Sequence, residues 1–210
     1  MTKNKEEEGF YIPTKKLKLL EGGVALLQDD LAEVLFTEEE IAEKVAALGA
    51  QISAFYAEEG INEVVVVGVL RGASVFMSDL VRRISVPLVF DFIDAVSYGK
   101  NSVSSGAVRI LKDLSEDIFG RHVLVVEDIV DTGATLQCLI NLLRARKPES
   151  LRLCAFLNKP SRRQAVVEPD FYGFDIADDF VVGYGMDFAG RYRQLPYIAI
   201  LNPAVYEPAT

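Results

Sequence analysis

Residues 127–135, with the sequence EDIVDTGAT, combine several side chains that could bind a ligand within nine positions. The adjacent carboxylates of Glu127 and Asp128 suit the hydroxyl groups of a diol. Residues 131–135 suit a phosphate, because a turn that opens a helix presents free backbone N–H groups to an anion. A phosphorylated sugar needs both. A lone Asp-Thr-Gly can also be a plain turn with Asp131 or Thr132 as helix N-cap, but the two preceding acids favour a binding site.

A strand and a helix are expected to position this motif. The apolar residues 123–126 predict a strand buried on both faces, as in a parallel sheet, and the apolar positions from Leu136 onward predict a helix to about Arg146. Ligands of open α/β sheets bind beyond the carboxyl ends of the strands. We therefore expect the acids at the carboxyl end of this strand, at the ligand-binding edge.

A second strand-loop-helix unit precedes the motif. Residues 64–70 predict another buried strand and residues 73–84 a helix, with Arg71 and Gly72 between them. This arrangement places the positive charge of Arg71 at the same edge of the sheet, next to Gly72, whose backbone a ligand can approach closely because it has no side chain. As an isolated feature, Arg71 could also be a surface arginine.

The remaining pattern alternates helices with short apolar strands. Thr37 and the acids after it predict the start of a helix that runs to about residue 58. Further strands are expected over residues 87–93, 108–111, 151–157, 170–176 and 180–184. The serine- and glycine-rich residues 97–106 predict a mobile loop at the tip of a hairpin, although a disordered connector has the same composition.

Several charged residues later in the chain could belong either to a ligand site or to the structure and surface of the protein. Lys159 directly follows a predicted strand, so it is either at the ligand edge or a solvated surface lysine. Arg162 and Arg163 are expected on a solvated basic surface, and His122 is expected to be structural. The glycines near residue 185 do not form GxGxxG, and the sequence contains no GxxxxGK[ST], which disfavours dinucleotide and P-loop sites.

The composition narrows the class of protein. The chain has 210 residues, is 50% hydrophobic and has a net charge of −9, so we expect one domain with a sizeable core and neither nucleic acid nor membrane as a partner. No apolar run is long enough to cross a bilayer, and the first residues lack a signal-peptide core. A cytoplasmic protein is the prediction.

Several short motifs together resemble a known family. Residues 127–135 are similar to the phosphoribosyl-diphosphate (PRPP) binding motif of type I phosphoribosyltransferases. The segments VLRG at 69–72, SYG at 97–99, the region of Lys159, and FVVGYGMD at 180–187 resemble the hypoxanthine/guanine members. The likeness runs in the family order from about Val64 to Leu201.

The resemblance implies roles for individual residues. Those implied to bind the sugar and phosphate of PRPP are Glu127, Asp128, Asp131, Thr132, Gly133, Ala134 and Thr135. Those implied on the pyrophosphate side are Arg71, Gly72, Ser97, Tyr98 and Arg193, and the peptide before Arg71 can be cis. Those implied to bind the base are Lys159, Phe180, Val181 and Asp187. Those implied to hold Mg²⁺ are Glu127, Asp128 and Asp187, and Asp131 is implied to be catalytic, acting on the N7 proton of the purine.

The resemblance also implies a fold and a reaction. The fold is α/β, a central and mostly parallel sheet flanked by helices, with a core over about residues 38–175 and a small hood from the N-terminal part and about residues 176–210. The reaction is transfer of the phosphoribosyl group from PRPP to hypoxanthine or guanine, giving IMP or GMP and pyrophosphate, in a homodimer or homotetramer. Two alternatives stay open: a transferase for another base, such as xanthine or orotate, and a PRPP-sensing nucleic-acid-binding regulator on the same fold.

Overall fold

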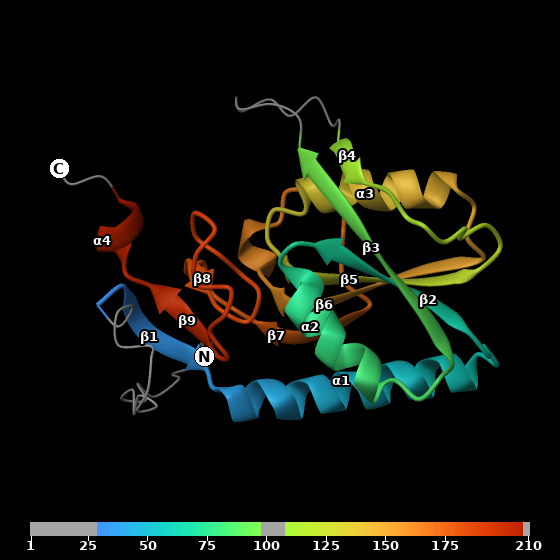
Figure 1. Cartoon of the computed structure of the whole chain (residues 1–210), viewed down its shortest axis with the longest axis horizontal. Helices are drawn as coiled ribbons and strands as arrows, with labels where there is room; N and C mark the ends of the chain where they lie inside the picture. Colours follow the sequence, from blue (N-terminus) through green and yellow to red (C-terminus); the bar gives the residue numbers. More distant parts are fainter. Residues whose placement is uncertain (1–28, 98–107, 208–210) are drawn as a thin grey trace, which may run out of the picture.

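A computed structural model describes residues 29–97 and 108–207, which form a large sheet, a small sheet and the helices around them (Figure 1). The large sheet has six strands in the order β4-β3-β2-β5-β6-β7. Its strands are β2 (Val64–Leu70), β3 (Leu88–Ser97), β4 (Val108–Lys112), β5 (His122–Val130), β6 (Ser150–Asn158) and β7 (Phe171–Asp175). All neighbouring pairs are parallel except β3 and β4. The predicted mostly parallel α/β sheet is confirmed.

Helices cover both faces of this sheet. α1 (Glu38–Glu58) and α2 (Ala73–Leu80) contact one face, and α3 (Ala134–Ala145) lies on the other (Figure 1). Alternate residues of β5 pack on opposite faces of the sheet. Leu124 and Val126 belong to the core under α1 and α2, and Val123 and Val125 belong to the core under α3. Because both faces of the strand are buried, its sequence is a continuous apolar run.

The first turn of α1 has the N-cap residue and the acidic residues that the sequence predicts. The Thr37 side chain accepts a hydrogen bond from the Glu40 backbone, and the Glu40 carboxylate accepts one from the Thr37 backbone at 2.9 Å, which together form a capping box. Three acids in this turn also suit the positive end of the helix dipole. The predicted bounds of this helix are confirmed.

The small sheet joins the two ends of the described chain. It has the order β1-β9-β8, from β1 (Leu31–Phe36), β9 (Ile198–Leu201) and β8 (Val181–Val182), and both pairings are antiparallel. The short helix α4 (Pro203–Tyr206) follows β9. This sheet is the expected hood, while its boundary with the core near residue 175 stays a prediction.

Several predicted boundaries are wrong in detail. The central strand, predicted over residues 123–126, continues through the two acids to Val130, so these acids lie in the carboxyl-terminal half of β5. The helix expected over residues 73–84 ends at Leu80 and continues as a 3-10 turn, η2 (Val81–Arg83). β3 runs four residues beyond the predicted end at Ile93, and β8 spans only two residues. The β3–β4 hairpin is confirmed, but the loop at its tip lies outside the described residues.

Candidate active site

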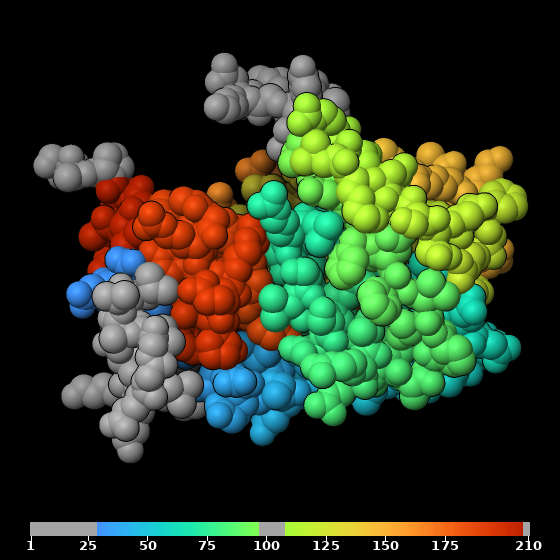
Figure 2. Space-filling model, viewed as in Figure 1, coloured from blue at the N-terminus to red at the C-terminus, as the bar shows by residue number. Residues whose placement is uncertain are grey.

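A cavity of about 420 Å³ lies where the carboxyl ends of β5 and β6 face the segments around β8. The residues that line it are Asp128, Ile129, Asp131, Lys159, Arg162, Asp178, Asp179, Phe180, Val181, Met186, Asp187 and Tyr206. Six of these were predicted as site residues from the sequence. The atoms of the C-terminal segments, red in Figure 2, pack closely beside those of the α2 region, green.

The turn between β5 and α3 has an open helix start. Gly133 is the N-cap residue of α3, with a φ of 76°, and no side chain caps the helix there. Neither Asp131 nor Thr132 takes the N-cap position that the plain-turn reading gave them. The Thr132 hydroxyl accepts from the Ala134 N–H at 3.5 Å, and a helix start of this kind has further backbone N–H groups that an anion can bind.

Two carboxylates lie side by side, half-buried, near the end of β5. Burial raises the pKa of Glu127 well above its ordinary value, and the neighbouring charge of Asp128 raises it further. Burial also raises the pKa of Asp128, against the lowering effects of its hydrogen bonds and of Arg193. A cation or a set of hydroxyl donors placed here would favour the charged forms of both groups.

The loop after β2 packs tightly against this carboxylate pair. The peptide between Leu70 and Arg71 is cis, as the resemblance implies. A Cβ on Gly72 would meet the Asp128 carboxylate, and a Cβ on Gly185 would stand 2.1 Å from the Gly72 carbonyl oxygen. Three motifs that are far apart in the sequence are therefore in direct contact.

Asp187 is held by its own turn. Its carboxylate accepts a hydrogen bond of 2.7 Å from the Gly190 backbone and forms an ion pair with Arg193. Arg193 also donates to the Gly185 carbonyl oxygen at 2.6 Å. Arg193 does not line the cavity itself, but it connects the predicted pyrophosphate side to Asp187, which does.

The predicted base-binding residues meet at the other end of the cavity. Lys159 is buried, its side chain only 7% exposed, and its Nζ donates to the Asp179 carbonyl oxygen at 2.6 Å. The ring of Phe180 is 38% exposed and stacks on Tyr206, with 5.1 Å between the ring centroids. Asp131 Oδ1 is buried and, among the described residues, receives no hydrogen bond. Because the Lys159 side chain is buried, the alternative that it is a solvated surface lysine is wrong.

Some predicted residues are not placed on the cavity wall. The residues that do not line it are Glu127, residues 132–135, Arg71 and Gly72. Only the backbone of Ser97 is described, and Tyr98 lies outside the described residues. Within residues 29–97 and 108–207, no three acids, histidines or cysteines gather closely enough to hold a metal ion alone.

The expectation of a solvated basic surface is wrong for Arg163, whereas Arg162 is exposed as expected, with 44% of its side chain accessible. The Arg163 side chain is only 9% exposed and donates to the Asp131 carbonyl oxygen at 2.6 Å and to Asn158. Arg162 is paired with two carboxylates and lines the cavity. The hydrogen bond to Asp178 and the charge of Asp131 raise the pKa of Arg162.

Two further lining residues carried no signal in the sequence analysis. Tyr206 comes from α4, whose start is fixed by the Asn202 side chain accepting from the Ala204 backbone. Asp178 lies in the connection between β7 and β8. Separately, His122 is structural as expected, with Nδ1 2.8 Å from Ser150 Oγ on the neighbouring strand. No helix within the two described ranges is both long and apolar enough to span a bilayer.

Comparisons with known proteins point to one family. Residues 37–189 match the family model described as the phosphoribosyl transferase domain. The chain is 48% identical to a hypoxanthine-guanine phosphoribosyltransferase of Bacillus subtilis, covering 87% of this chain and 99% of that one. It is 49% identical to a hypoxanthine phosphoribosyltransferase of Haemophilus influenzae, covering 79% and 93%.

Other matches agree with these. A crystal structure of a hypoxanthine phosphoribosyltransferase from Staphylococcus aureus superposes with a TM-score of 0.83 at 45% identity, covering 87% of this chain and 98% of that one. The chain is also 48% identical to a bifunctional protein, TilS/HprT, of Listeria innocua, of which it spans only 28%. The chain belongs to the type I phosphoribosyltransferase family.

Proposed function

We propose that the protein is a purine salvage enzyme that transfers the 5-phosphoribosyl group from PRPP to hypoxanthine or guanine, giving IMP or GMP and pyrophosphate. The observation that carries the proposal is the wall of the cavity, where a buried lysine, an aromatic ring and the Asp131 carboxylate converge. These three groups match the exocyclic oxygen, the ring face and the N7–H group of a 6-oxopurine.

The base is bound by Lys159, Phe180 and Val181. A lysine ammonium has three donors, and one of them is used by the Asp179 carbonyl oxygen, which leaves capacity to donate to the C6 oxygen of the purine. The partly exposed ring of Phe180 stacks on the purine, and the backbone of Val181 in β8 faces the base edge.

Asp131 acts on the proton of the base. As the C1–O bond to pyrophosphate breaks and the C1–N9 bond forms, positive charge develops on the purine and its N7–H becomes more acidic. Asp131 Oδ1, which is buried without a hydrogen-bond donor, accepts this proton or balances its charge. This oxygen lies 3.1 Å from Arg162 Nε without hydrogen-bond geometry, and the N7–H group of the bound base would be its hydrogen-bond donor.

PRPP is bound by the elements around the base site. The open start of α3, with Thr132, Gly133, Ala134 and Thr135, holds the 5-phosphate, and Glu127 and Asp128 hold the ribose hydroxyls. Arg71, Gly72, Ser97, Tyr98 and Arg193 stabilise the departing pyrophosphate, whose charge increases as C1 gains oxocarbenium character.

The carboxylates of this site suit Mg²⁺. Magnesium is commonly bound by one or two carboxylates together with substrate phosphates, which fits a chain whose described acids form no complete metal cage. Asp187 on one side and the half-buried pair Glu127 and Asp128 on the other would hold it, and a cation there would offset the effect of burial, which raises the pKa of both carboxyl groups. Bound Mg²⁺ supplies charge neutralisation of the pyrophosphate.

The protein is proposed to be a homodimer or homotetramer of the cytoplasm. Phe90 and Val96, six positions apart on one side of β3, are 55% and 39% exposed, and exposed apolar side chains on one side of a strand favour a covered surface. Both described cysteines are free thiols, as suits a reducing compartment. Sedimentation velocity of wild type and Phe90→Ser tests the assembly, and a wild-type monomer at micromolar concentration refutes it.

One assay tests the reaction. Purified protein, Mg²⁺ and PRPP are mixed separately with hypoxanthine, guanine, xanthine, orotate and adenine, and nucleotide products are separated by chromatography. We expect IMP and GMP, each with stoichiometric pyrophosphate. Product from xanthine or orotate alone would assign a different base, and no product from any base would refute the proposed function.

A further inference from the structure

Arg162 lies between two carboxylates of the base cavity. Its Nε is 3.1 Å from Asp131 Oδ1, and its Nη1 donates to Asp178 Oδ1 at 2.9 Å. The contact with Asp131 is at ion-pair distance without hydrogen-bond geometry, so it acts on the carboxylate mainly through charge. One guanidinium group therefore interacts with both acids at once.

The two carboxylates belong to different walls of the cavity. Asp131 follows β5 of the large sheet, whereas Asp178 precedes β8 of the small sheet, and both line the cavity together with Arg162. Asp178 is only two positions before Phe180, the predicted stacking residue. The ion pairs of Arg162 thus connect the residue that acts on the base proton to the segment that carries the base-stacking ring.

The backbone around Arg162 is well fixed. Arg162 ends the 3-10 turn η3 (Pro160–Arg162), and its N–H donates to the Lys159 carbonyl oxygen at 3.2 Å. The next residue, Arg163, is buried and donates to the Asp131 carbonyl oxygen. Lys159 also approaches Asp178, at 4.0 Å. One short turn therefore directs two cations at the segment before β8 and anchors the backbone of Asp131.

We propose that Arg162 is a positioning residue for the transfer reaction, which orients the Asp131 carboxylate and fixes the Asp178 segment relative to it. This rests on the proposed function, because it assigns Arg162 to the base half of that site. Arg162 acts through Asp131 and Asp178 and has no role toward PRPP. A lysine in its place cannot replace it, since two different nitrogens of a planar guanidinium make the two contacts.

The test is steady-state kinetics with separate KM values for hypoxanthine and PRPP, in wild type, Arg162→Gln, Arg162→Lys, Asp178→Asn and the double variant Arg162→Gln/Asp178→Asn. Misplacing a reacting group by about 1 Å can reduce rates by about 10²-fold, so we expect both Arg162 variants to lose about 10- to 100-fold in kcat/KM for hypoxanthine. The KM for PRPP should stay unchanged. Asp178→Asn should cost less in the Arg162→Gln background than alone, because its main partner is then absent.

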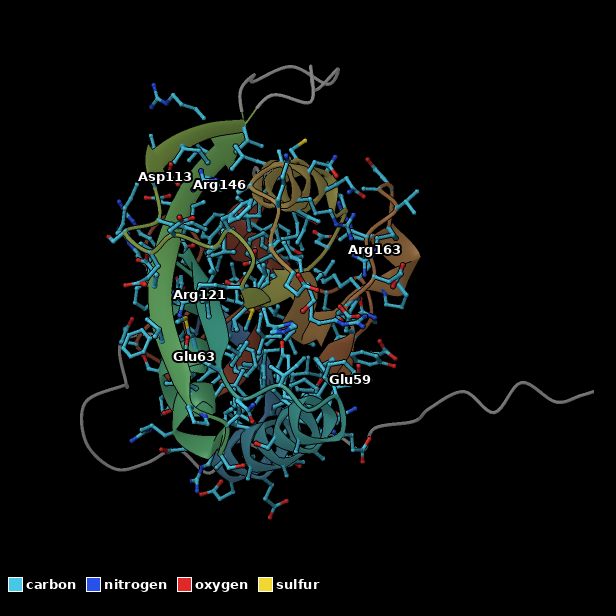
Figure 3. All side chains as sticks on the ribbon, turned by 90° about the vertical axis from the view of Figure 1, so that its right-hand side faces the viewer. Glu59, Glu63, Asp113, Arg121, Arg146 and Arg163 are labelled. Carbon is cyan, nitrogen blue, oxygen red and sulfur yellow. The ribbon has the colours of Figure 1, made fainter. Side chains whose placement is uncertain are left out.

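Arg146→Gln is the matched control. Arg146 forms an ion pair of 2.8 Å with Asp113 and is 31% exposed, against 44% for Arg162. Figure 3 shows Arg146 beside Asp113, well apart from Arg163. We expect this control to have wild-type kinetics, and thermal melts of all variants to be similar because Arg162 is a surface side chain.

Three results would overturn the inference: wild-type hypoxanthine kinetics in Arg162→Gln, full activity in Arg162→Lys, or equal losses for hypoxanthine and PRPP that follow the fraction of unfolded protein. Failure of the proposed function is a separate result, since wild type would then form no IMP or GMP. An active wild type with an unaffected Arg162→Gln refutes only the role of Arg162.

Discussion

Gly72 lies so close to Asp128 that a Cβ on the glycine would stand 1.5 Å from Asp128 Oδ2. Only a residue without a side chain allows the loop after β2 to approach the end of β5 in this way. This contact joins the proposed pyrophosphate loop to one of the two proposed sugar carboxylates.

Gly72→Ala should therefore reduce kcat/KM for PRPP. The new methyl group would push the Asp128 carboxylate away from its position, and a displacement of this size can cost about 10²-fold in rate. Steady-state kinetics with varied PRPP measures the effect. Ser78→Ala, which changes an exposed hydroxyl of α2 that bonds only the Ser74 carbonyl oxygen, is the control. Wild-type kinetics in Gly72→Ala would show that the contact is unimportant for PRPP.

Asp131→Asn should keep PRPP binding and lose turnover. The proposed phosphate contacts come from the start of α3, whereas the Asp131 carboxylate acts on the base, and general acid–base groups contribute about 10²- to 10⁴-fold. Calorimetric binding of PRPP and kcat for hypoxanthine separate the two effects. An unchanged kcat would remove Asp131 from the mechanism.

Lys159→Gln should reduce the preference for 6-oxopurines over adenine. The buried ammonium donates to an oxygen at C6, but adenine has an amino group there, so two donors would meet. Sites built on such a contact reject the wrong ligand by about 10⁴-fold, and a glutamine amide can rotate to accept from adenine. Comparing kcat/KM for the three bases in both proteins decides this. A wild type that uses adenine as well as hypoxanthine would contradict the role of Lys159.

Tyr206→Leu should raise the KM for hypoxanthine. The Tyr206 ring stacks on Phe180 at a 28° interplanar angle, and aromatic pairs of this kind contribute about 0.5–1.5 kcal/mol, or about 2- to 10-fold. Tyr206→Phe keeps the ring and should behave as wild type. Tyr172→Leu, at an exposed tyrosine of β7, provides the comparison. Equal KM values in all four proteins would show that the stack does not support the base site.

The stability of the sheet edge should depend on the ionisation of Asp91. Burial raises the pKa of Asp91, but hydrogen bonds from the Glu116, Phe92 and Ser115 backbones and from Lys112 outweigh it, so the pKa lies below its ordinary value. A lowered folded-state pKa stabilises the protein above the unfolded-state pKa of about 3.9, and this stabilisation is lost as the pH falls through the folded-state pKa.

Asp91→Asn should accordingly lower the free energy of unfolding at pH 7 by about 1.5–3 kcal/mol, the usual range for a hydrogen bond to a charged group. The difference from wild type should shrink as the pH falls below about 4. Urea unfolding at several pH values measures it. A difference that is constant from pH 7 to pH 3 would mean that the Asp91 charge does not contribute.

The sequence predicted the large sheet because its strands are buried on both faces. Residues 64–67 and 123–126 are continuous apolar runs, and parallel strands under helices require such runs. β1 gave no comparable signal, since only Leu31 and Phe36 of its six residues are buried. Its pairing partner β9 also lies at the opposite end of the described chain.

The same reasoning separates the site residues that were predicted from those that were missed. Asp131, Lys159 and Phe180 stand at strand ends within recognisable motifs. Arg162 and Arg163 were expected in solvent because the groups that bind them, Asp131 and Asp178, come from other segments of the chain. A local pattern shows the charge of an arginine but not the distant carboxylate or carbonyl that binds it.

The pairing of β1 with β9 also bears on how the protein folds. Leu31 is opposite Leu201, so this pairing closes almost the whole chain, and contacts between residues so distant in sequence form late because closing a long loop costs entropy. Among the described strands, β8, which carries Val181, pairs with β9 alone. During refolding we therefore expect the nucleobase site to be assembled last, with enzymatic activity returning after the burial of the large sheet is complete.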